Sequence, residues 1–156
     1  MNPDVNTSRP RVLVADPDPE TSALLARQLE WSGYDATTVY NGRDALDVIA
    51  RLHPAAVVLE VKMDVLTGYE VVRRLREDPR NRLMPVIMIS ARAGKLDRDF
   101  AFTVGADDYI KKPFHSSELV ARLSMRLGGE TPEPRTQPIV RPLRRTLQPV
   151  PALATR

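Results

Sequence analysis

The chain has 156 residues and a hydrophobic content of 42%, which is enough for one domain with a packed core. It has no cysteine, which excludes disulfides and thiolate metal sites. It also has no apolar run near the roughly 20 residues of a membrane helix and no apolar signal-peptide core, so we expect a cytoplasmic protein. Residues 128–156 hold five of the 23 basic and two of the 20 acidic side chains. This leaves 18 of each elsewhere, so the expected domain has no electrostatic attraction for nucleic acid.

The first part of the chain predicts two strands and two helices in alternation. Arg11–Ala15 is a short apolar strand, and Asp18 is suited to cap a helix that begins near Pro19, because proline is tolerated in a first helical turn. Tyr34–Val39 is the second predicted strand. The second helix ends before Pro54. The residues expected to face the core are Leu24, Leu25 and Leu29 in the first helix and Ala45, Ile49 and Leu52 in the second.

The remaining elements continue this alternation. Ala56–Leu59 is a continuous apolar run, typical of a strand buried on both faces, and it stops at the charged residue Glu60. Five strands alternating with helices predict βαβ units and a parallel sheet, and therefore an α/β fold. The further strands are expected over Pro85–Ser90 and Asp108–Lys111, and the further helices from Gly68 to Asp78, over Leu96–Val104 and over Ser116–Leu127.

Four polar residues fall at equivalent places, directly after buried strands. They are Asp16, Glu60, Ser90 and Lys112. Because ligands of open parallel sheets bind beyond the carboxyl ends of the strands, these side chains are expected to lie at one edge. Carboxylates, a hydroxyl and an ammonium group suit magnesium and phosphoryl groups, although each residue alone could equally cap a helix or form a turn.

Several segments resemble the receiver domain of bacterial two-component response regulators, over roughly Arg11 to Leu127. They are VLVADPDPE, PAAVVLEV followed by GYEVVRRLR, PVIMISARA and GADDYIKKPF. The resemblance implies a flavodoxin-like (βα)5 fold, with a doubly wound sheet of five parallel strands. It also implies a signalling module that accepts phosphate from a histidine kinase on a magnesium-assisted aspartate. Residues 128–156 are too few to form a DNA-binding effector domain, so we expect a stand-alone module.

Two positions depart from the family pattern. The resemblance places Glu60 at the phosphoacceptor aspartate, and it places Asp16 and Pro17 at the acidic pair that holds magnesium, so that one metal carboxylate is lost. Ser90 matches the switch hydroxyl and Tyr109 the switch aromatic residue. The remaining matches are Lys112, at the lysine that contacts the phosphoryl group, and Pro113, which follows a cis peptide bond in the family.

The departures disfavour phosphoryl transfer. Glutamate is one methylene longer than aspartate, so the Glu60 carboxylate stands partly where an acyl phosphate would be, and small misplacements of a nucleophile cost about 100-fold in rate. Magnesium binding is expected to be weak or absent. Lys62 would point to the same rim if the strand alternation continued, and its ammonium group could pair with Glu60; a solvated surface lysine is the alternative.

Receiver domains usually signal through the surface of the fourth helix, fifth strand and fifth helix. Here Tyr109 and Phe100 are expected on that surface, as an anchor for a protein partner or a second copy. Phe102 is expected to be buried, because the family places an apolar core residue there. An isolated exposed aromatic residue without a function is the alternative for Phe100.

The favoured hypothesis is a pseudo-receiver that acts by protein–protein interaction, with a histidine kinase among the candidate partners. One alternative is a true phosphoacceptor with magnesium held by Asp16, Asp18 and Glu60. Another is a nucleic-acid adaptor that uses the arginines of the tail. An enzyme is not expected, since His53 and His115 suit surface positions. We expect flexible residues 1–10, a domain over 11–127 and a disordered tail over 128–156, which contains six of the 14 prolines.

Overall fold

Strand and helix alternate five times along the chain, as the sequence predicted, in a computed structural model that describes residues 8–92 and 94–129. The five strands are parallel, in the order β2-β1-β3-β4-β5, which is a doubly wound flavodoxin-like sheet. The strands are β1 (Arg11–Ala15), β2 (Asp35–Val39), β3 (Ala56–Glu60), β4 (Val86–Ser90) and β5 (Asp108–Lys111). The helices are α1 (Pro19–Trp31), α2 (Gly42–Leu52), α3 (Gly68–Glu77), α4 (Lys95–Val104) and α5 (Ser116–Arg126).

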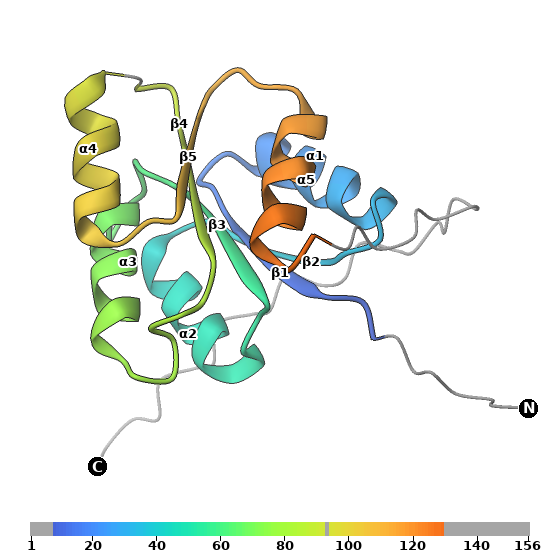
Figure 1. Cartoon of the computed structure of the whole chain (residues 1–156), viewed down its shortest axis with the longest axis horizontal. Coiled ribbons are helices and arrows are strands. Elements are labelled where there is room, and N and C mark those ends of the chain that lie inside the picture. Colours follow the sequence, from blue (N-terminus) through green and yellow to red (C-terminus); the bar gives the residue numbers. More distant parts are fainter. Residues whose placement is uncertain (1–7, 93, 130–156) are drawn as a thin grey trace, which may run out of the picture.

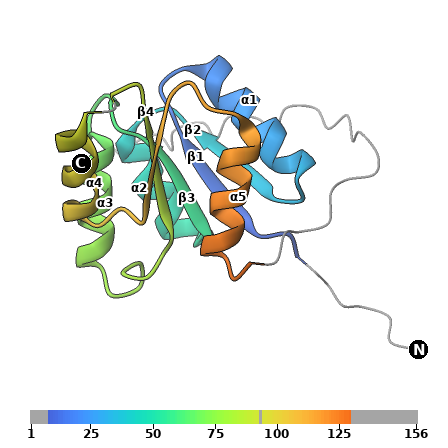
Figure 2. The same ribbon diagram turned by 45° about the horizontal axis from the view of Figure 1, so that its top comes forward.

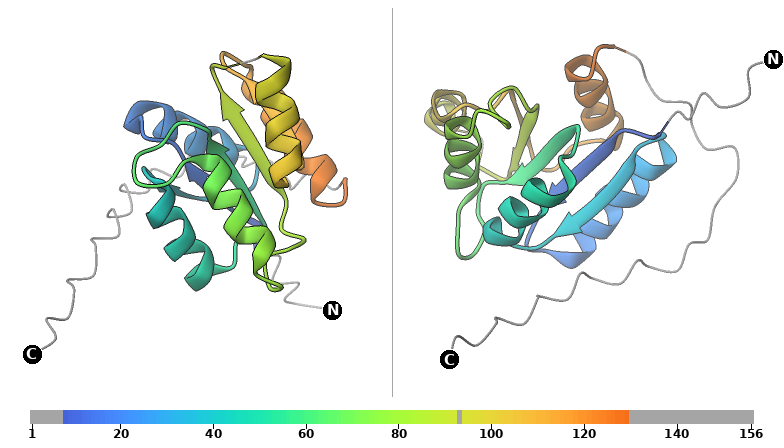
Figure 3. Two further views of the ribbon diagram at one scale, coloured as in Figure 1. Left: turned by 90° about the vertical axis from the view of Figure 1, so that its left-hand side faces the viewer. Right: turned by 90° about the horizontal axis from the view of Figure 1, so that it is seen from below.

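The helices form a layer on each face of the sheet (Figures 1 and 2). Helices α1 and α5 cover one face, where Leu29 and Leu123 pack on Val12 and Val58. Helices α2, α3 and α4 lie side by side over the other face (Figure 3), and their apolar residues pack with those of the strands in a second core cluster. Every residue of β3 is buried, which is why this strand has no polar residue before Glu60.

Local hydrogen bonds fix where the helices begin. Asp18 caps α1 through its carboxylate, which accepts hydrogen bonds from the N–H groups of Glu20 and Thr21. Helix α3 begins with a capping box, because the Thr67 hydroxyl accepts from the N–H of Glu70 while the Glu70 carboxylate accepts from that of Thr67. These caps place the helix starts beside the carboxyl ends of the strands.

The expectation that Leu24 faces the core is wrong. Leu25 and Leu29 are buried, but Leu24 is 52% exposed. Successive residues of a helix are about 100° apart, so Leu24 lies off the face that Leu25 and Leu29 share. Leu24 is seven residues from Trp31, which is also exposed, and the two therefore lie on the same outer side of α1.

The connection from β3 to α3 is tightly packed against the strand end. A Cβ atom on Gly68 would lie 2.4 Å from the carbonyl oxygen of Glu60, so only glycine allows this approach. Val65, in the same connection, has a φ of 69° and is exposed. A β-branched residue is rarely found in this left-handed region, so the backbone is strained there.

A partly buried arginine joins α3 to the starts of β4 and β5. Arg76 donates hydrogen bonds to the carbonyl groups of Met84 and Gly105, at 2.8 and 2.9 Å, and to the Asp107 carboxylate, at 3.0 Å. The same Asp107 oxygen accepts from the N–H of Val86, the first residue of β4. Arg76 therefore fixes the amino-terminal ends of these strands.

Several predictions concern the two ends of the chain. The domain boundaries at residues 10/11 and 127/128 stay predictions. Most of the predicted flexible start and disordered tail, namely residues 1–7 and 130–156, lies outside the described residues. Within residues 8–92 and 94–129, no helix has the length and apolar character that a membrane span requires.

Candidate functional site

Polar side chains from four strand ends are brought to the carboxyl edge of the sheet. Asp16 follows β1, Glu60 ends β3, Ser90 ends β4, and Lys112 follows β5. Strands β1 and β3 are neighbours at the point where the chain changes direction across the sheet, and this is where ligands bind in folds of this type. Asp16, Glu60 and Ser90 are almost completely buried, at 1%, 7% and 3% exposure.

Lys112 bridges the two carboxylates. Its Nζ atom lies 2.6 Å from Asp16 Oδ2 and 2.6 Å from Glu60 Oε2. Burial by itself lowers the pKa of Lys112, but the hydrogen bonds and the negative charges of Asp16 and Glu60 outweigh it, and the pKa is raised. The ammonium group is therefore held charged between two buried carboxylates.

Of the two alternatives for Lys62, the structure shows the solvated surface lysine and not the ion pair with Glu60. The Lys62 backbone N–H donates to Glu60 Oε1 at 3.2 Å, while the Lys62 side chain is exposed and makes no ion pair within the described part of the chain. The alternation argument fails because β3 ends at Glu60 and the chain bends directly afterwards. As a result, both oxygens of Glu60 are engaged, one by Lys112 and one by the backbone.

The carboxylates near the end of β1 have separate contacts. Asp16 Oδ1 accepts a hydrogen bond from the Asp18 N–H at 2.9 Å, and its other oxygen contacts Lys112. The exposed Asp18 carboxylate caps α1, and the hydrogen bond from the Thr21 hydroxyl is the main cause that lowers the pKa of Asp18. Residue 17 is proline and offers no side-chain ligand. Within the described residues, no three His, Cys, Asp or Glu side chains are grouped so that they could hold a metal ion.

Ser90 and Tyr109 both bind the backbone of Arg92. The Ser90 hydroxyl accepts a hydrogen bond from the Arg92 N–H at 3.0 Å, and the Tyr109 hydroxyl donates to the Arg92 carbonyl. Tyr109 is only 1% exposed, and its ring points into the domain, where its hydroxyl reaches Arg92; its contribution to a partner surface stays a prediction. The two side chains thus hold the start of the connection from β4 to α4.

Two exposed aromatic residues lie on α4. Phe100 is 50% exposed, as expected, and its ring packs edge-on against Tyr69 of α3 with the ring centroids 4.7 Å apart. Phe102 is 44% exposed, so the expectation that it is buried is wrong. Ala101 is the residue of α4 that points into the core, and Phe102 is turned about 100° away from it.

The remaining candidate residues are placed as follows. The peptide bond between Lys112 and Pro113 is cis. His53 and His115 are exposed, in agreement with the surface positions expected for them. Sequence reasoning missed Arg92, because it acts through its backbone N–H and carbonyl, which every residue type other than proline has. No sequence signal identifies such a residue.

Comparison with known proteins identifies the family. The family model described as "Response regulator receiver domain" matches residues 12–124. The chain belongs to this family. A curated relative, the response regulator MprA of Mycolicibacterium vanbaalenii, is 41% identical to this receiver domain over 123 residues, which are 79% of this chain and 52% of MprA. The chain thus spans about half the length of the curated relatives that it matches.

Solved structures agree with this assignment. A response regulator from Chloroflexus aurantiacus matches with a TM-score of 0.74 and 29% identity, over 77% of this chain and 98% of that one. The receiver domain of the sensor histidine kinase PA1611 from Pseudomonas aeruginosa matches with a TM-score of 0.72 and 28% identity, over 78% and 99% of the two chains. That structure has a magnesium ion coordinated in its active-site cleft. The receiver domain described here is accordingly a signalling module of two-component systems, in which response regulators interact with histidine kinases and other proteins.

Proposed function

We propose that this receiver domain is a pseudo-receiver, which signals by protein–protein contact without accepting a phosphoryl group at Glu60. The observation that carries the proposal is the position of Lys112, whose Nζ atom lies 2.6 Å from both Glu60 and Asp16. A carboxylate that attacks phosphorus needs a free oxygen in line with the leaving group. Each of the two oxygens of Glu60 already has one contact, with Lys112 or with the Lys62 N–H, so attack by either oxygen would compete with that contact.

The charges support the same proposal. The Glu60 carboxylate already occupies the contact with Lys112 that an acyl phosphate would make, and it carries one negative charge where a phosphoryl group carries roughly two. An incoming phosphoryl group would also face the buried carboxylate of Asp16 without a free cation beside it.

The donors of this chain fit magnesium poorly. Receiver domains normally use magnesium, and the PA1611 receiver domain binds it in the active-site cleft. Here the oxygens of Asp16 and Glu60 are taken by Lys112 and by backbone N–H groups, residue 17 is proline, and Asp18 caps α1. Mg²⁺ demands near-ideal octahedral geometry from oxygen ligands, so it would have to displace Lys112 from both carboxylates.

The contacts of Lys112 also support a single resting arrangement of the switch residues. The Lys112 N–H donates to the Ser90 carbonyl at 2.8 Å, and Ser90 and Tyr109 in turn bind the backbone of Arg92. The ion pair and the connection to α4 are therefore joined by hydrogen bonds. We assign the output to the face of α4, β5 and α5, with Phe100 as the anchor for a protein partner or a second copy.

The proposal is tested by intact-protein mass after incubation with acetyl phosphate and magnesium. The unmodified chain, Glu60→Ala and Glu60→Asp are expected to gain no phosphoryl group, because Pro17 still supplies no carboxylate in Glu60→Asp. Glu60→Asp combined with Pro17→Asp restores both positions, so labelling of this variant would show that the assay works. A labile phosphoryl group on the unmodified chain that is absent from Glu60→Ala would instead identify a true phosphoacceptor, and the proposal would be wrong.

A further inference from the structure

A groove separates α1 from α5 on the face of the sheet opposite α2, α3 and α4. It has a volume of about 460 Å³ and is open to solvent along one side. None of the described residues that line it is charged. They are Gln28, Trp31 and Ser32 at the end of α1, and Ser116, Ser117, Val120 and Ala121 in the first turns of α5.

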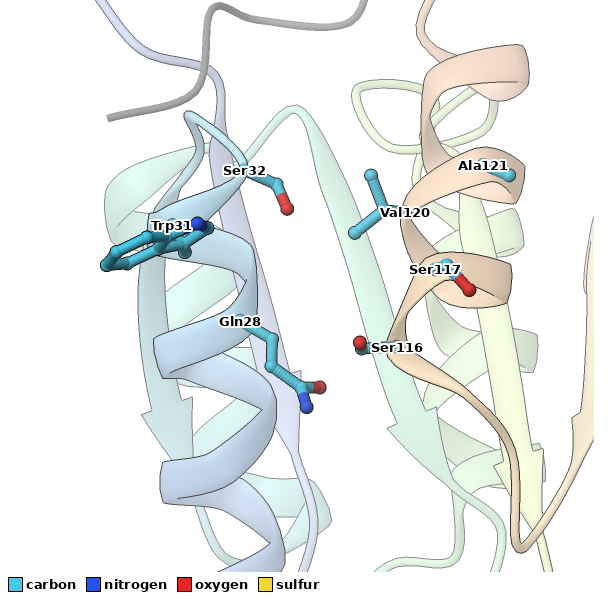
Figure 4. A pocket seen from close by; sticks show the side chains of 7 residues that line it. All are labelled: Gln28, Trp31, Ser32, Ser116, Ser117, Val120 and Ala121. Carbon is cyan, nitrogen blue, oxygen red and sulfur yellow. The ribbon is translucent and has the colours of Figure 1, made fainter. Parts of the chain in front are cut away.

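The groove offers hydrogen-bond donors beside an apolar floor. Figure 4 shows Gln28 and Ser32 reaching from α1 toward α5, and Ser116 and Val120 reaching from α5 toward α1, while the Trp31 indole lies on the α1 side and points away from α5. The amide of Gln28 and the hydroxyls of Ser32 and Ser116 have no side-chain hydrogen bond to another described residue. An occupant should therefore be uncharged, with small apolar groups and with carbonyl oxygens that need donors.

Proline-rich chain has this chemistry. Proline has no N–H, so a stretch that contains proline presents carbonyl acceptors beside an apolar ring and has fewer donors of its own. The sequence beyond the described residues contains Gln137-Pro138-Ile139-Val140, which is uncharged and lies between Arg135 and Arg141.

The chain that follows α5 is long enough to extend from the end of this helix to the groove. Gly128 and Gly129 have φ values of 99° and 80°, and the Gly129 N–H donates to the Ser124 carbonyl, so a tight turn ends the helix. Helix α5 has 11 residues and is about 16 Å long. Seven residues lie between Gly129 and Gln137, and the eight steps from one to the other can span up to about 26 Å, which is more than the length of the helix.

We propose that the segment Gln137–Val140 of this chain docks in the groove between α1 and α5. Because the segment is tethered, its effective concentration is about 1 mM, and a site with a Kd of about 0.1 mM would be about 90% occupied. Even weak complementarity is thus sufficient for docking. The docked segment covers this face of α1 and α5 and holds the arginines that follow it, Arg141 to Arg145, beside the domain. This inference does not depend on whether Glu60 is phosphorylated.

The test uses the full chain and paramagnetic broadening of its amide NMR signals. The chain has no cysteine, so one introduced cysteine carries a nitroxide label at a single place. A label on Thr136→Cys, next to the segment, is expected to remove most of the signal intensity of Ser32, Ser117 and Val120. A label on Thr155→Cys is the matched control and should leave these signals intact.

Two further variants test the groove itself. Ser116→Arg places a long charged side chain in the groove and should restore the signals that the Thr136→Cys label removes, whereas Ala50→Arg, at an exposed position of α2, should not. Mixing labelled protein with isotope-enriched unlabelled protein separates the two sources of the segment. The proposal would be overturned if the Thr136→Cys label left the groove signals intact. It would also be overturned if the mixed sample showed equal broadening, because the occupant would then be a second copy of the chain.

Discussion

Replacement of Lys112 by methionine removes one cation from between two buried carboxylates. The side chains of Asp16 and Glu60 are 1% and 9% exposed, and that of Lys112 is 25% exposed. Methionine keeps the apolar stem of lysine but leaves the two carboxylates close together without a counter-charge. Removal of one partner from a buried ion pair costs about 3–5 kcal/mol. Because Lys112 retains some contact with water, we expect the lower end, about 3 kcal/mol, for the free energy of unfolding at neutral pH.

Urea unfolding measures this loss. For slopes of about 1–3 kcal/mol per molar urea, a change of 3 kcal/mol lowers the midpoint by about 1–3 M. Lys111→Met is the matched control, since Lys111 is exposed, ends β5 and has no ion pair within the described residues. Its effect should stay within about 0.5 kcal/mol.

A double-mutant cycle shows whether the charge of Glu60 causes the loss. Glu60→Gln in the Lys112→Met background removes one of the two unpaired charges and should recover about 1–2 kcal/mol, within the range found for residues in contact. If Lys112→Met and Lys111→Met shift the urea midpoint equally, the ion pairs of Lys112 do not stabilise the domain, and the reasoning from its geometry is refuted.

Three further predictions follow from single contacts. Because the pKa of Lys112 is raised in the folded state, its stabilising charge is fully present below the ordinary lysine value of 10.5 and is lost as the pH rises through the higher folded-state value. Above about pH 10.5, the urea midpoint should therefore fall more steeply for the unmodified chain than for Lys112→Met. Arg76→Lys should lower the free energy of unfolding by about 2–3 kcal/mol, since lysine cannot reach Asp107 and the strand-end carbonyls together. Thermal unfolding measures this, with Arg73→Lys as the control. Equal melting temperatures of the two variants would contradict the prediction. Val65→Gly should raise the free energy of unfolding by about 0.5–1 kcal/mol by relieving the left-handed backbone, and an unchanged or lower urea midpoint would show that this strain is absent.

The fold and the strand-end residues could be predicted because they depend on local patterns. A buried parallel strand requires an uninterrupted apolar run, and the first charge after Ala56–Leu59 therefore marks where the strand leaves the core. The parallel sheet then brings residues such as Asp16 and Glu60 to one edge, whatever the details of packing.

The contacts of individual side chains could not be predicted in the same way. The assignment of Lys62 to Glu60 assumed that β3 continued by one more pair of residues, while the chain in fact bends after Glu60. Leu24 and Phe102 were misplaced because a rotation of about 100° separates a core position from an exposed one, and the apolar character of a residue does not reveal that angle. The groove between α1 and α5 depends on the spacing of two helices that are far apart in sequence, for which no local pattern exists.

The close approach of Gly68 to Glu60 links the site to α3 mechanically. Because no Cβ atom fits between residue 68 and the Glu60 carbonyl, the end of β3 and the first turn of α3 are in direct backbone contact. The capping box of Thr67 and Glu70 makes that turn rigid, and Arg76, at the other end of the same helix, holds the starts of β4 and β5. Helix α3 therefore connects the carboxyl edge of the sheet, at Glu60, to the amino edge, at the starts of β4 and β5, through direct contacts at both of its ends.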